Sequence, residues 1–309
     1  YRPMKTQSMK ASMSGQDIPL FDRIRSSWNI LRAYRNGVFG NVSPALAHHR
    51  HMLDVMRRHA GVEPKDATIL DVGSGQMAQQ TALFLAEGAR VVGVDLEFPT
   101  YRMNPKVFFE VAKRNGVERA VKSAVRHVLF DRKYMAELSK QLGKPVPFEQ
   151  VEVRAMDADA LEFPDDHFDF VHSSWVFEHV ENVRGAIREI SRVLKPTGVA
   201  WIGTHLFPSL SGGHHLDWIR PGEQTDSPVS PWDHLLDNQF PVNTYLNRLR
   251  LDEYREIFDS EVEVIEEMLT HEGEEFLTPE LEATLLDKGY TRQDLTTRTH
   301  EIVCRRKSD

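Results

Sequence analysis

The chain has 309 residues, with 38 Lys and Arg against 46 Asp and Glu, and a formal net charge of −8. This length is sufficient for a hydrophobic core without disulfide or metal crosslinks. The 40% hydrophobic and 27% charged content is typical of a soluble globular protein and disfavours disordered, collagen-like and coiled-coil classes. The negative balance disfavours nucleic acid as a partner, because such binding needs a basic footprint.

Cysteine content and hydropathy limit the compartment. Cys304 is the single cysteine, which excludes an intramolecular disulfide and any metal site built from several cysteines. A single thiol fits a reducing compartment, so we expect a cytoplasmic protein. No apolar run approaches the roughly 18–20 residues of a membrane span. The first 30 residues contain no apolar core of signal-peptide type.

The N-terminal region is predicted to be an arm followed by helices. Residues 1–20 are polar without a steady period and indicate a loose arm. A weak helical pattern covers residues 21–34, and a clearer one covers 45–60, where Gly61 supplies a stop. We therefore divide the chain into residues 1–60, an arm with helices, and residues 61–309, one large domain.

Apolar strands and helices then alternate along the chain. This alternation predicts an α/β fold, a Rossmann-like, doubly wound and mostly parallel sheet. Strands of such a sheet are buried on both faces, which explains their nearly continuous apolar runs. The predicted strands are residues 68–72, 90–95, 151–155, 168–172 and 199–204, and the predicted helices are 77–86 and 183–194.

Two inserts interrupt this alternation. Residues 98–148, between the second and third strands, read as helices, and from Phe98 to Pro145 they carry eleven Lys and Arg against four Asp and Glu. Val117, Val121, Val125 and Leu129 recur at helical spacing, which predicts a helix packed through this line with a solvated basic face. The alternative is a lid or dock for an anionic acceptor or a membrane surface.

The second insert, residues 206–248, is rich in Pro, Gly, Ser and His and is predicted to be irregular and on the substrate side. A helix at 251–258 and closing strands at 262–265 and 301–304 follow it.

A glycine loop is the strongest chemical signal. Asp71-Val72-Gly73-Ser74-Gly75 follows the first strand, and Asp95 ends the second. Glycines let the backbone turn tightly and approach a ligand closely. An acidic residue at the second strand's tip can accept both hydroxyls of a ribose, at the edge where such sheets bind nucleosides. A nucleoside-containing cofactor is therefore expected here.

Together with Asp95 and three downstream segments, this loop resembles class I S-adenosylmethionine (SAM) dependent methyltransferases, most closely the methyltransferase domain 11 group. The segments are residues 157–169, 178–180 and 192–198, with Asp95 between them and the loop. The resemblance covers roughly Thr68–Thr204, without the first insert.

The resemblance implies SAM as the cofactor and assigns its contacts. Gly73 and Gly75 would border the methionine part, Asp71 would lie near the amino group, and Asp95 would hold the ribose. Asp157 and Ala158 would meet the adenine, and Ser173 would contact SAM through its backbone. The implied cofactor-binding set is Asp71, Gly73, Ser74, Gly75, Asp95, Leu96, Asp157, Ala158 and Ser173. Where the family often has a third glycine, this chain has Met77.

Two other ligand classes stay open. Gly73 to Ala78 formally matches the dinucleotide pattern G-x-G-x-x-G/A, so an NAD(P)-dependent oxidoreductase is the alternative. Asp71 disfavours a dinucleotide cofactor, because a carboxylate repels a pyrophosphate and suits a ligand bearing an amino group. A non-catalytic SAM-binding partner is the third hypothesis.

Histidines after the fifth strand are candidates for the chemistry. Methyl transfer from a sulfonium is a direct displacement, so the protein mainly aligns donor and acceptor. A hydroxyl acceptor also needs a base, and histidine suits neutral pH. The catalytic candidates are His205 and His214, and Gly212-Gly213 permits a turn that aims a histidine inward. The substrate candidates are His179, His215, Trp218, Trp232 and His234.

Structural interpretations compete with these roles. The loop can be a surface Ω-loop with hydrogen-bonded histidines, and His179 can be structural. A metal set of His205, His214 and His234 with Asp217 or Asp233 has enough ligands, but the spacing matches no compact motif. We therefore predict no metal site.

The sequence as a whole predicts a SAM-dependent methyltransferase. We expect O-methylation of a small molecule or a glycoconjugate hydroxyl, with N- or C-methylation of another small metabolite as the alternative. The expected partner is a small-molecule or glycan-type acceptor. Peripheral membrane contact stays open, and the oligomeric state is not predicted.

Overall fold

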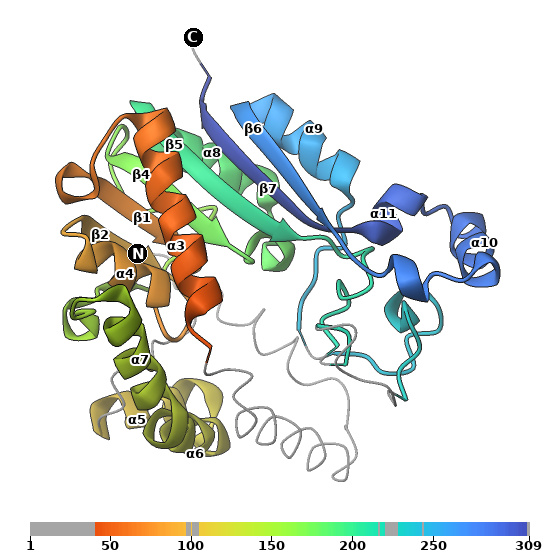
Figure 1. Ribbon diagram of the computed structural model, residues 1–309, viewed down its shortest axis with the longest axis horizontal. Helices are drawn as coiled ribbons and strands as arrows, with labels where there is room; N and C mark the ends of the chain where they lie inside the picture. The colour runs from red at the N-terminus through yellow and green to blue at the C-terminus, as the bar shows by residue number, and fades with distance from the viewer. Residues whose placement is uncertain are drawn as a thin grey trace. The chain divides into compact units, whose positions relative to one another are not determined.

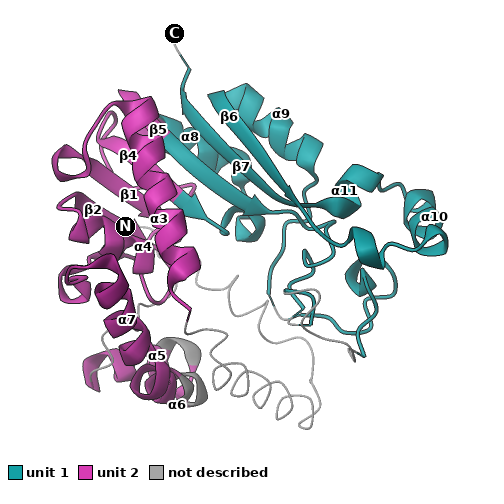
Figure 2. Cartoon of the chain, in the orientation of Figure 1, with its two compact units in different colours: residues 1–16, 173–191, 200–309 teal, residues 17–172, 192–199 magenta. Residues whose placement is uncertain are grey.

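The computed structural model describes residues 41–96, 100, 105–215, 217–219, 228–242 and 244–307. The predicted arm at 1–20 and helix at 21–34 lie outside these residues. The chain divides into two compact units: residues 1–16, 173–191 and 200–309 form unit 1, and residues 17–172 and 192–199 form unit 2 (Figure 2). Each unit is described by itself.

The central sheet has seven strands in the order β3-β2-β1-β4-β5-β7-β6 (Figure 1). The pairs β1–β2 and β2–β3 are parallel, whereas β7 runs antiparallel to β5 and β6. The order reverses between β1 and β4, as in doubly wound sheets. This confirms the α/β, mostly parallel, Rossmann-like fold. The strands are β1 Thr68–Val72, β2 Arg90–Val94, β3 Val153–Arg154, β4 Phe168–Ser174, β5 Leu194–His205, β6 Val262–His271 and β7 Thr297–Arg306.

The core of unit 2 surrounds its parallel strands. Ile69 and Leu70 of β1 and Phe168 and Phe170 of β4 are fully buried, as the apolar runs predict. Helix α4 (Gln79–Ala86) starts two residues later than predicted, because Ala78 adopts the left-handed conformation at its N-cap. Helix α3 (Ser43–Val55) continues as a π-helical turn, Met56–Ala60, which ends at Gly61 with φ of 63°.

The first insert is helical, as predicted, but its apolar line is not packed. It comprises α5 (Pro105–Asn115), α6 (Val117–Arg126), a π-helical turn at His127–Asp131 and α7 (Arg132–Leu142). Val117, Val121, Val125 and Leu129 are 46–64% exposed. The predicted packing face is therefore wrong for the described residues. Ala120 and Ser123 are buried instead, because small residues let the helix approach its neighbours closely.

Unit 1 contains most of α8 (Val183–Val193), together with α9 (Leu251–Glu261), α10 (Pro279–Asp287) and α11 (Arg292–Thr296). The end of α9 is joined to α8 by Glu261, whose carboxylate accepts from Arg184 and Arg188 at 3.0 and 2.8 Å. The sequence reading missed α10 and α11. Each begins at a threonine that caps it, Thr278 and Thr291, so the signal was present.

The second insert is irregular, as predicted. Within its described residues the regular element is one 3-10 turn, Asp233–Leu235. Two tryptophans of the insert lie in a separate apolar cluster of unit 1, formed by Leu210, Trp218, Val229, Trp232, Leu235, Leu277, Leu285 and Leu295. No helix in the described part of the chain has the length and apolar character needed to cross a membrane.

Candidate functional site

The glycine loop of unit 2 has the backbone conformation that its sequence predicts. Gly73 and Gly75 both have positive φ, 71° and 68°. The amides of Gly73 and Ser74 donate to the carbonyl of Val94, at 2.8 and 3.2 Å, and so hold the loop against the end of β2. Positive φ is inexpensive for glycine, which explains the residue type at both positions.

Space and an unpaired hydroxyl mark this loop as a ligand site. A Cβ on Gly75 would meet nothing within 4 Å, so the loop is open at that point. The hydroxyl of Ser74 is buried and has no hydrogen-bond partner among the described residues. Gly93 of β2 allows this packing, because a Cβ there would lie 2.9 Å from the Cβ of Ser74. A ligand with hydrogen-bonding groups fits such a loop.

Asp71 is engaged within the protein. Its carboxylate is 1% exposed, accepts from the Thr81 hydroxyl at 2.5 Å and contacts His172 Nδ1 at 2.7 Å. His172 Nε2 lies 3.0 Å from His48 Nε2 of α3. Burial lowers the pKa of His48 to about 3, so this ring is neutral at pH 7. Asp71 thus anchors α3 and α4 to the sheet, and a contact with a SAM amino group would have to share one of its oxygens.

Asp95 directly follows β2, where it was predicted, and Asp157 lies three residues after the end of β3. Asp95 Oδ2 accepts from the amide of Gly75 at 2.7 Å, which ties the loop to the tip of β2. Leu96 beside it is 51% exposed. Asp157 is exposed. Its pKa is raised, mainly by loss of hydration at the carboxyl and to a smaller extent by repulsion from Asp159. Ala158 next to it is half-buried.

The basic insert reaches the glycine loop through one arginine. Arg126, at the end of α6, donates to Gln76 Oε1 at 3.0 Å and to the Thr100 hydroxyl at 2.9 Å. The amide of Thr100 in turn donates to the carbonyl of Gln76 at 2.9 Å. Asp131 accepts from the same guanidinium at 3.2 Å. The insert therefore fixes the residue that follows Gly75.

In unit 1, Glu178 lies on a 3-10 turn, Phe177–His179, with an exposed fraction of 2%. Asn247 holds this turn, since its side-chain amide donates to the carbonyls of Phe177 and Val180 and its backbone amide to that of Glu178. Burial raises the pKa of Glu178 to about 7. Its Oε1 is buried without a hydrogen-bond partner among the described residues.

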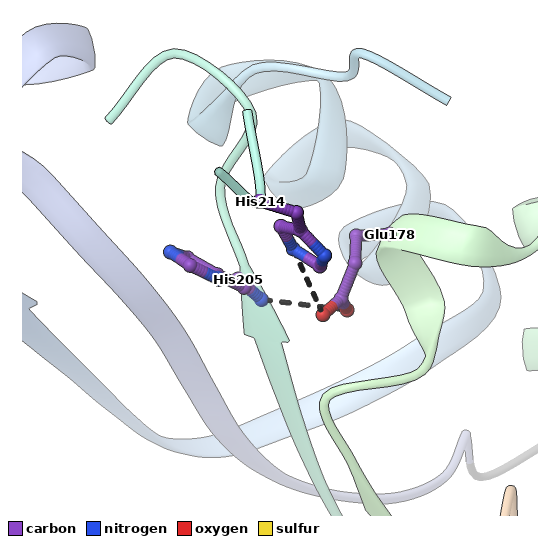
Figure 3. A group of neighbouring side chains, drawn as sticks. All are labelled: Glu178, His205 and His214. Carbon is purple, nitrogen blue, oxygen red and sulfur yellow. Dashed lines mark hydrogen bonds and ion pairs between the residues drawn. The ribbon is translucent and has the colours of Figure 1, made fainter. Parts of the chain in front are cut away.

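His205 and His214, the predicted catalytic residues, both approach Glu178 (Figure 3). His205 ends β5, and its Nε2 lies 2.8 Å from the Ser211 hydroxyl. That hydroxyl gives its proton to Glu272 Oε1 at 2.5 Å, so it accepts from His205 Nε2. The proton of His205 therefore sits on Nε2, and Nδ1 keeps a lone pair.

His214 is held inward by a strained turn. Its φ is 57°, and its amide donates to the carbonyl of Ser211 at 2.9 Å. A Cβ on Gly212 would lie 2.2 Å from the carbonyl oxygen of Leu206, and one on Gly213 would lie 2.5 Å from the ring of His234. The predicted role of Gly212-Gly213 in aiming a histidine inward is thus explained by steric limits.

The two imidazoles are neutral at physiological pH. Burial first, and then the neighbouring histidines, lower the pKa of His205 to about 3 and that of His214 to about 4. Their rings stack, with centroids 5.0 Å apart. Neutral rings can accept protons or bind a metal ion, but burial makes them weak bases.

The other predicted substrate residues have different surroundings. Trp232 is fully buried and Trp218 is 9% exposed, and their indoles donate to the carbonyls of Pro208 and Val229. Their placement favours a core role over stacking on a sugar. His234 donates to the carbonyl of Phe207 at 2.9 Å, and Asp233 accepts from the amides of Gln239 and Phe240, so the sequence-based metal set does not assemble.

Two further predicted substrate residues remain near the surface. His215 is half-buried and its Nδ1 accepts from the amide of Asp217 at 3.3 Å. His179 is exposed, and its Nδ1 donates to the carbonyl of Tyr245 at 2.8 Å. Ser173, predicted to contact the cofactor, is fully buried in β4, and its hydroxyl has no partner among the described residues.

Sequence reasoning missed three residues. Glu178 lies in segment 178–180, which carries the family resemblance, but it was assigned no role. His172 was taken only as part of an apolar strand, although a histidine in such a run signals a buried polar partner. Trp175 directly follows β4, is 43% exposed and adopts the left-handed conformation, which is costly for a bulky residue and often marks function.

Part of the chain resembles a known family. The family model described as "Methyltransferase domain" matches residues 117–202, which include β3, β4 and α8. An uncharacterized methyltransferase, YcgJ of Bacillus subtilis, is 31% identical over 105 residues, 32% of this chain and 42% of the relative. Residues 117–202 are thus similar to a methyltransferase domain.

Other relatives are of the same kind. The uncharacterized methyltransferase Rv0089 of Mycobacterium tuberculosis is 28% identical over 107 residues, 33% of this chain and 54% of the relative. The chain thus spans about half the length of these relatives. The family match starts after the glycine loop, so the loop is described by its own geometry.

Solved structures also resemble the chain. The YcgJ crystal structure overlaps with a TM-score of 0.42 at 15% identity, covering 84% of this chain and 100% of that one. An S-adenosylmethionine dependent methyltransferase from Mesorhizobium loti overlaps with a TM-score of 0.40 at 18% identity, covering 78% and 91%. Overlaps at this level carry no information on activity.

Proposed function

We propose that the protein transfers a methyl group from SAM to a hydroxyl of a small molecule or a glycoconjugate. The observation that carries the SAM proposal is the glycine loop, where open space above Gly75 adjoins the buried, unpaired hydroxyl of Ser74. The methyltransferase domain, matched at residues 117–202, supports the reaction class.

The cofactor would be held by residues of unit 2. Gly73, Ser74 and Gly75 would face its methionine part, and Asp95 and Leu96 its ribose and adenine side. Asp157 and Ala158 would meet the adenine edge. Bound SAM supplies an activated methyl group on a sulfonium, so the protein's own task is to align the acceptor.

The proton of an acceptor hydroxyl needs a base, and we assign this role to His205 or His214. Both are neutral at pH 7 because burial lowers their pKa, so each has a ring nitrogen able to accept a proton. Glu178, whose pKa burial raises to about 7, can share that proton.

Binding of SAM and of S-adenosylhomocysteine, measured by isothermal titration calorimetry, tests the cofactor. Gly75→Ala should abolish binding, because its Cβ enters the open space and its backbone has φ of 68°. Gly143→Ala is the matched control, since Gly143 also has positive φ with nothing within 4 Å, but ends α7. Unchanged affinity in Gly75→Ala, or binding of NADH in place of SAM, would refute the proposal.

Methyl transfer to a panel of hydroxyl, amine and carbon acceptors tests the reaction. Hydroxyl acceptors should be methylated, and His205→Gln or His214→Asn should lower kcat by about 100-fold or more, as for loss of a general base. Full turnover in both variants would exclude the base assignment while leaving the SAM proposal intact.

A further inference from the structure

Three side chains of unit 1 converge although the sequence separates them by up to 36 positions. One ligand atom each of Glu178, His205 and His214 lies within 4.8 Å of the others (Figure 3). Glu178 comes from the turn after β4, His205 from the end of β5 and His214 from the glycine turn. Two imidazoles with one carboxylate are a frequent ligand set of zinc and of non-haem iron.

The cluster is incomplete in hydrogen bonds. Glu178 Oε1 and His214 Nε2 lie 3.9 Å apart, and both atoms are buried without a partner among the described residues. A buried polar atom left unpaired costs about 1–3 kcal/mol. A cation between them would satisfy both atoms at once.

The surroundings fix the tautomer of His205 and the direction of His214. His205 donates through Nε2 to Ser211, which is hydrogen-bonded to Glu272. This chain from carboxylate to hydroxyl to imidazole leaves the lone pair on Nδ1 and resembles the outer hydrogen bonds around metal-bound histidines. The strained backbone of His214 is held by glycines 212 and 213, so its direction is determined by the turn.

A fourth nitrogen lies beside the cluster. His179 Nε2 is 4.0 Å from Glu178 Oε1, and its Nδ1 donates to the carbonyl of Tyr245, which leaves Nε2 with a lone pair. Its ring packs edge-on against His214 with centroids 5.0 Å apart. His179 is thus placed to join the coordination or to face a ligand of the ion.

We propose that Glu178, His205 and His214 bind one divalent transition-metal ion, with Zn²⁺ as the best match. The imidazole nitrogens favour Zn²⁺, Fe²⁺ or Co²⁺ over Mg²⁺ and Ca²⁺, which prefer oxygen ligands. Bonds of about 2.1 Å bring ligand atoms to within about 3.0–3.4 Å of each other, so the side chains close by less than about 2 Å on binding. Three protein ligands leave a coordination position for water or an oxygen of a bound molecule.

Titration of the chelator-treated full chain with Co²⁺ tests this site, because a cobalt–imidazole site gives a visible absorption band. We expect one equivalent to bind and Zn²⁺ to displace it. Glu178→Gln and His214→Asn should each weaken binding by about 100-fold or more, because loss of outer-shell groups alone costs about 10–100-fold. Asn suits position 214, since it tolerates the left-handed backbone.

Controls separate the site from a general effect. His215→Asn, in the same turn but outside the cluster, should bind Co²⁺ as the wild type does. Ser211→Ala keeps all three ligands and should weaken binding by about 10-fold. Near-UV circular dichroism verifies that each variant is folded. If Glu178→Gln or His214→Asn does not fold, His205→Gln is measured in its place.

The outcomes are decisive in either direction. Absence of a saturable band in the wild type, equal affinity in Glu178→Gln, or equal weakening by His215→Asn would overturn the proposal. In that case Glu178 and His214 share a proton instead. SAM binding is measured separately on unit 2 residues, so failure of the metal site and failure of the cofactor proposal are distinguishable. A bound ion would take the same nitrogens of His205 and His214, so it would replace their assignment as the base.

Discussion

The carboxylate of Asp71 and the imidazole of His172 lie 2.7 Å apart in the interior of unit 2, and both side chains are nearly free of solvent contact. Only Val72 separates Asp71 from Gly73, so this pair holds the end of β1 from which the glycine loop starts. The Thr81 hydroxyl occupies the other carboxylate oxygen.

Asp71→Asn should therefore lower the free energy of unfolding by about 2–3 kcal/mol, because an amide cannot accept from both Thr81 and His172. Urea unfolding followed by fluorescence measures this change, and His172→Gln completes a double-mutant cycle. Asp54→Asn, at an exposed carboxylate of α3, is the control and should stay within about 0.5 kcal/mol. Equal losses in Asp71→Asn and Asp54→Asn would show that the buried pair contributes nothing.

The stability of unit 2 should depend on pH through His49. Burial lowers its pKa to about 4, against 6.5 for an unperturbed histidine, although Glu87 opposes the shift. Between pH 6.5 and 4 the unfolded chain binds more protons at this position, so stability falls as the pH falls. At pH 5 the loss from this group is about 2 kcal/mol.

His49→Asn should reduce the difference in unfolding free energy between pH 7 and pH 5 by that amount, although it lowers stability at pH 7. Met52→Leu, at a buried and non-titrating position of the same helix, should keep the wild-type difference. An undiminished pH dependence in His49→Asn would contradict the assignment.

The two tryptophans Trp232 and Trp175 share a left-handed backbone but differ in burial, 0% against 43% exposed. Trp232→Ala should cost about 3–5 kcal/mol of stability, because it empties the cluster around Leu210. Trp175→Ala should cost less than about 1 kcal/mol and serves as the matched control. Thermal unfolding measures the stability of both variants. Unchanged stability in Trp232→Ala would contradict the core role and favour Trp232 as an acceptor contact.

The apolar line of α6 should tolerate charge. Val125 is 47% exposed, so Val125→Glu should change the unfolding free energy by no more than about 0.5 kcal/mol. Ala120, on the buried side of the same helix, provides the contrast, because Ala120→Glu places a charge in the interior. A large loss in Val125→Glu, measured by urea unfolding, would mean that the line is covered.

Much of the fold is determined by local sequence. The β1 and β4 runs are apolar enough to be buried on both faces, and the glycines at 73 and 75 fit the positive φ of the loop. The position of Asp95 directly after β2 follows from the alternation of strands and helices along the chain. These features depend on neighbouring residues, so a reader of the sequence can derive them.

The tertiary structure alone decides the rest. The apolar spacing of Val121 and Val125 predicts a packed face, but periodicity does not say which face a neighbour covers. Trp218 and Trp232 read equally well as a sugar-binding wall or as core. Glu178 and His214 meet because a turn after β4 and a glycine turn after β5 fold toward each other in unit 1, a contact that no local pattern encodes. Spacing along the chain therefore revealed the glycine loop, whereas the cluster of Glu178, His205 and His214 required the folded structure.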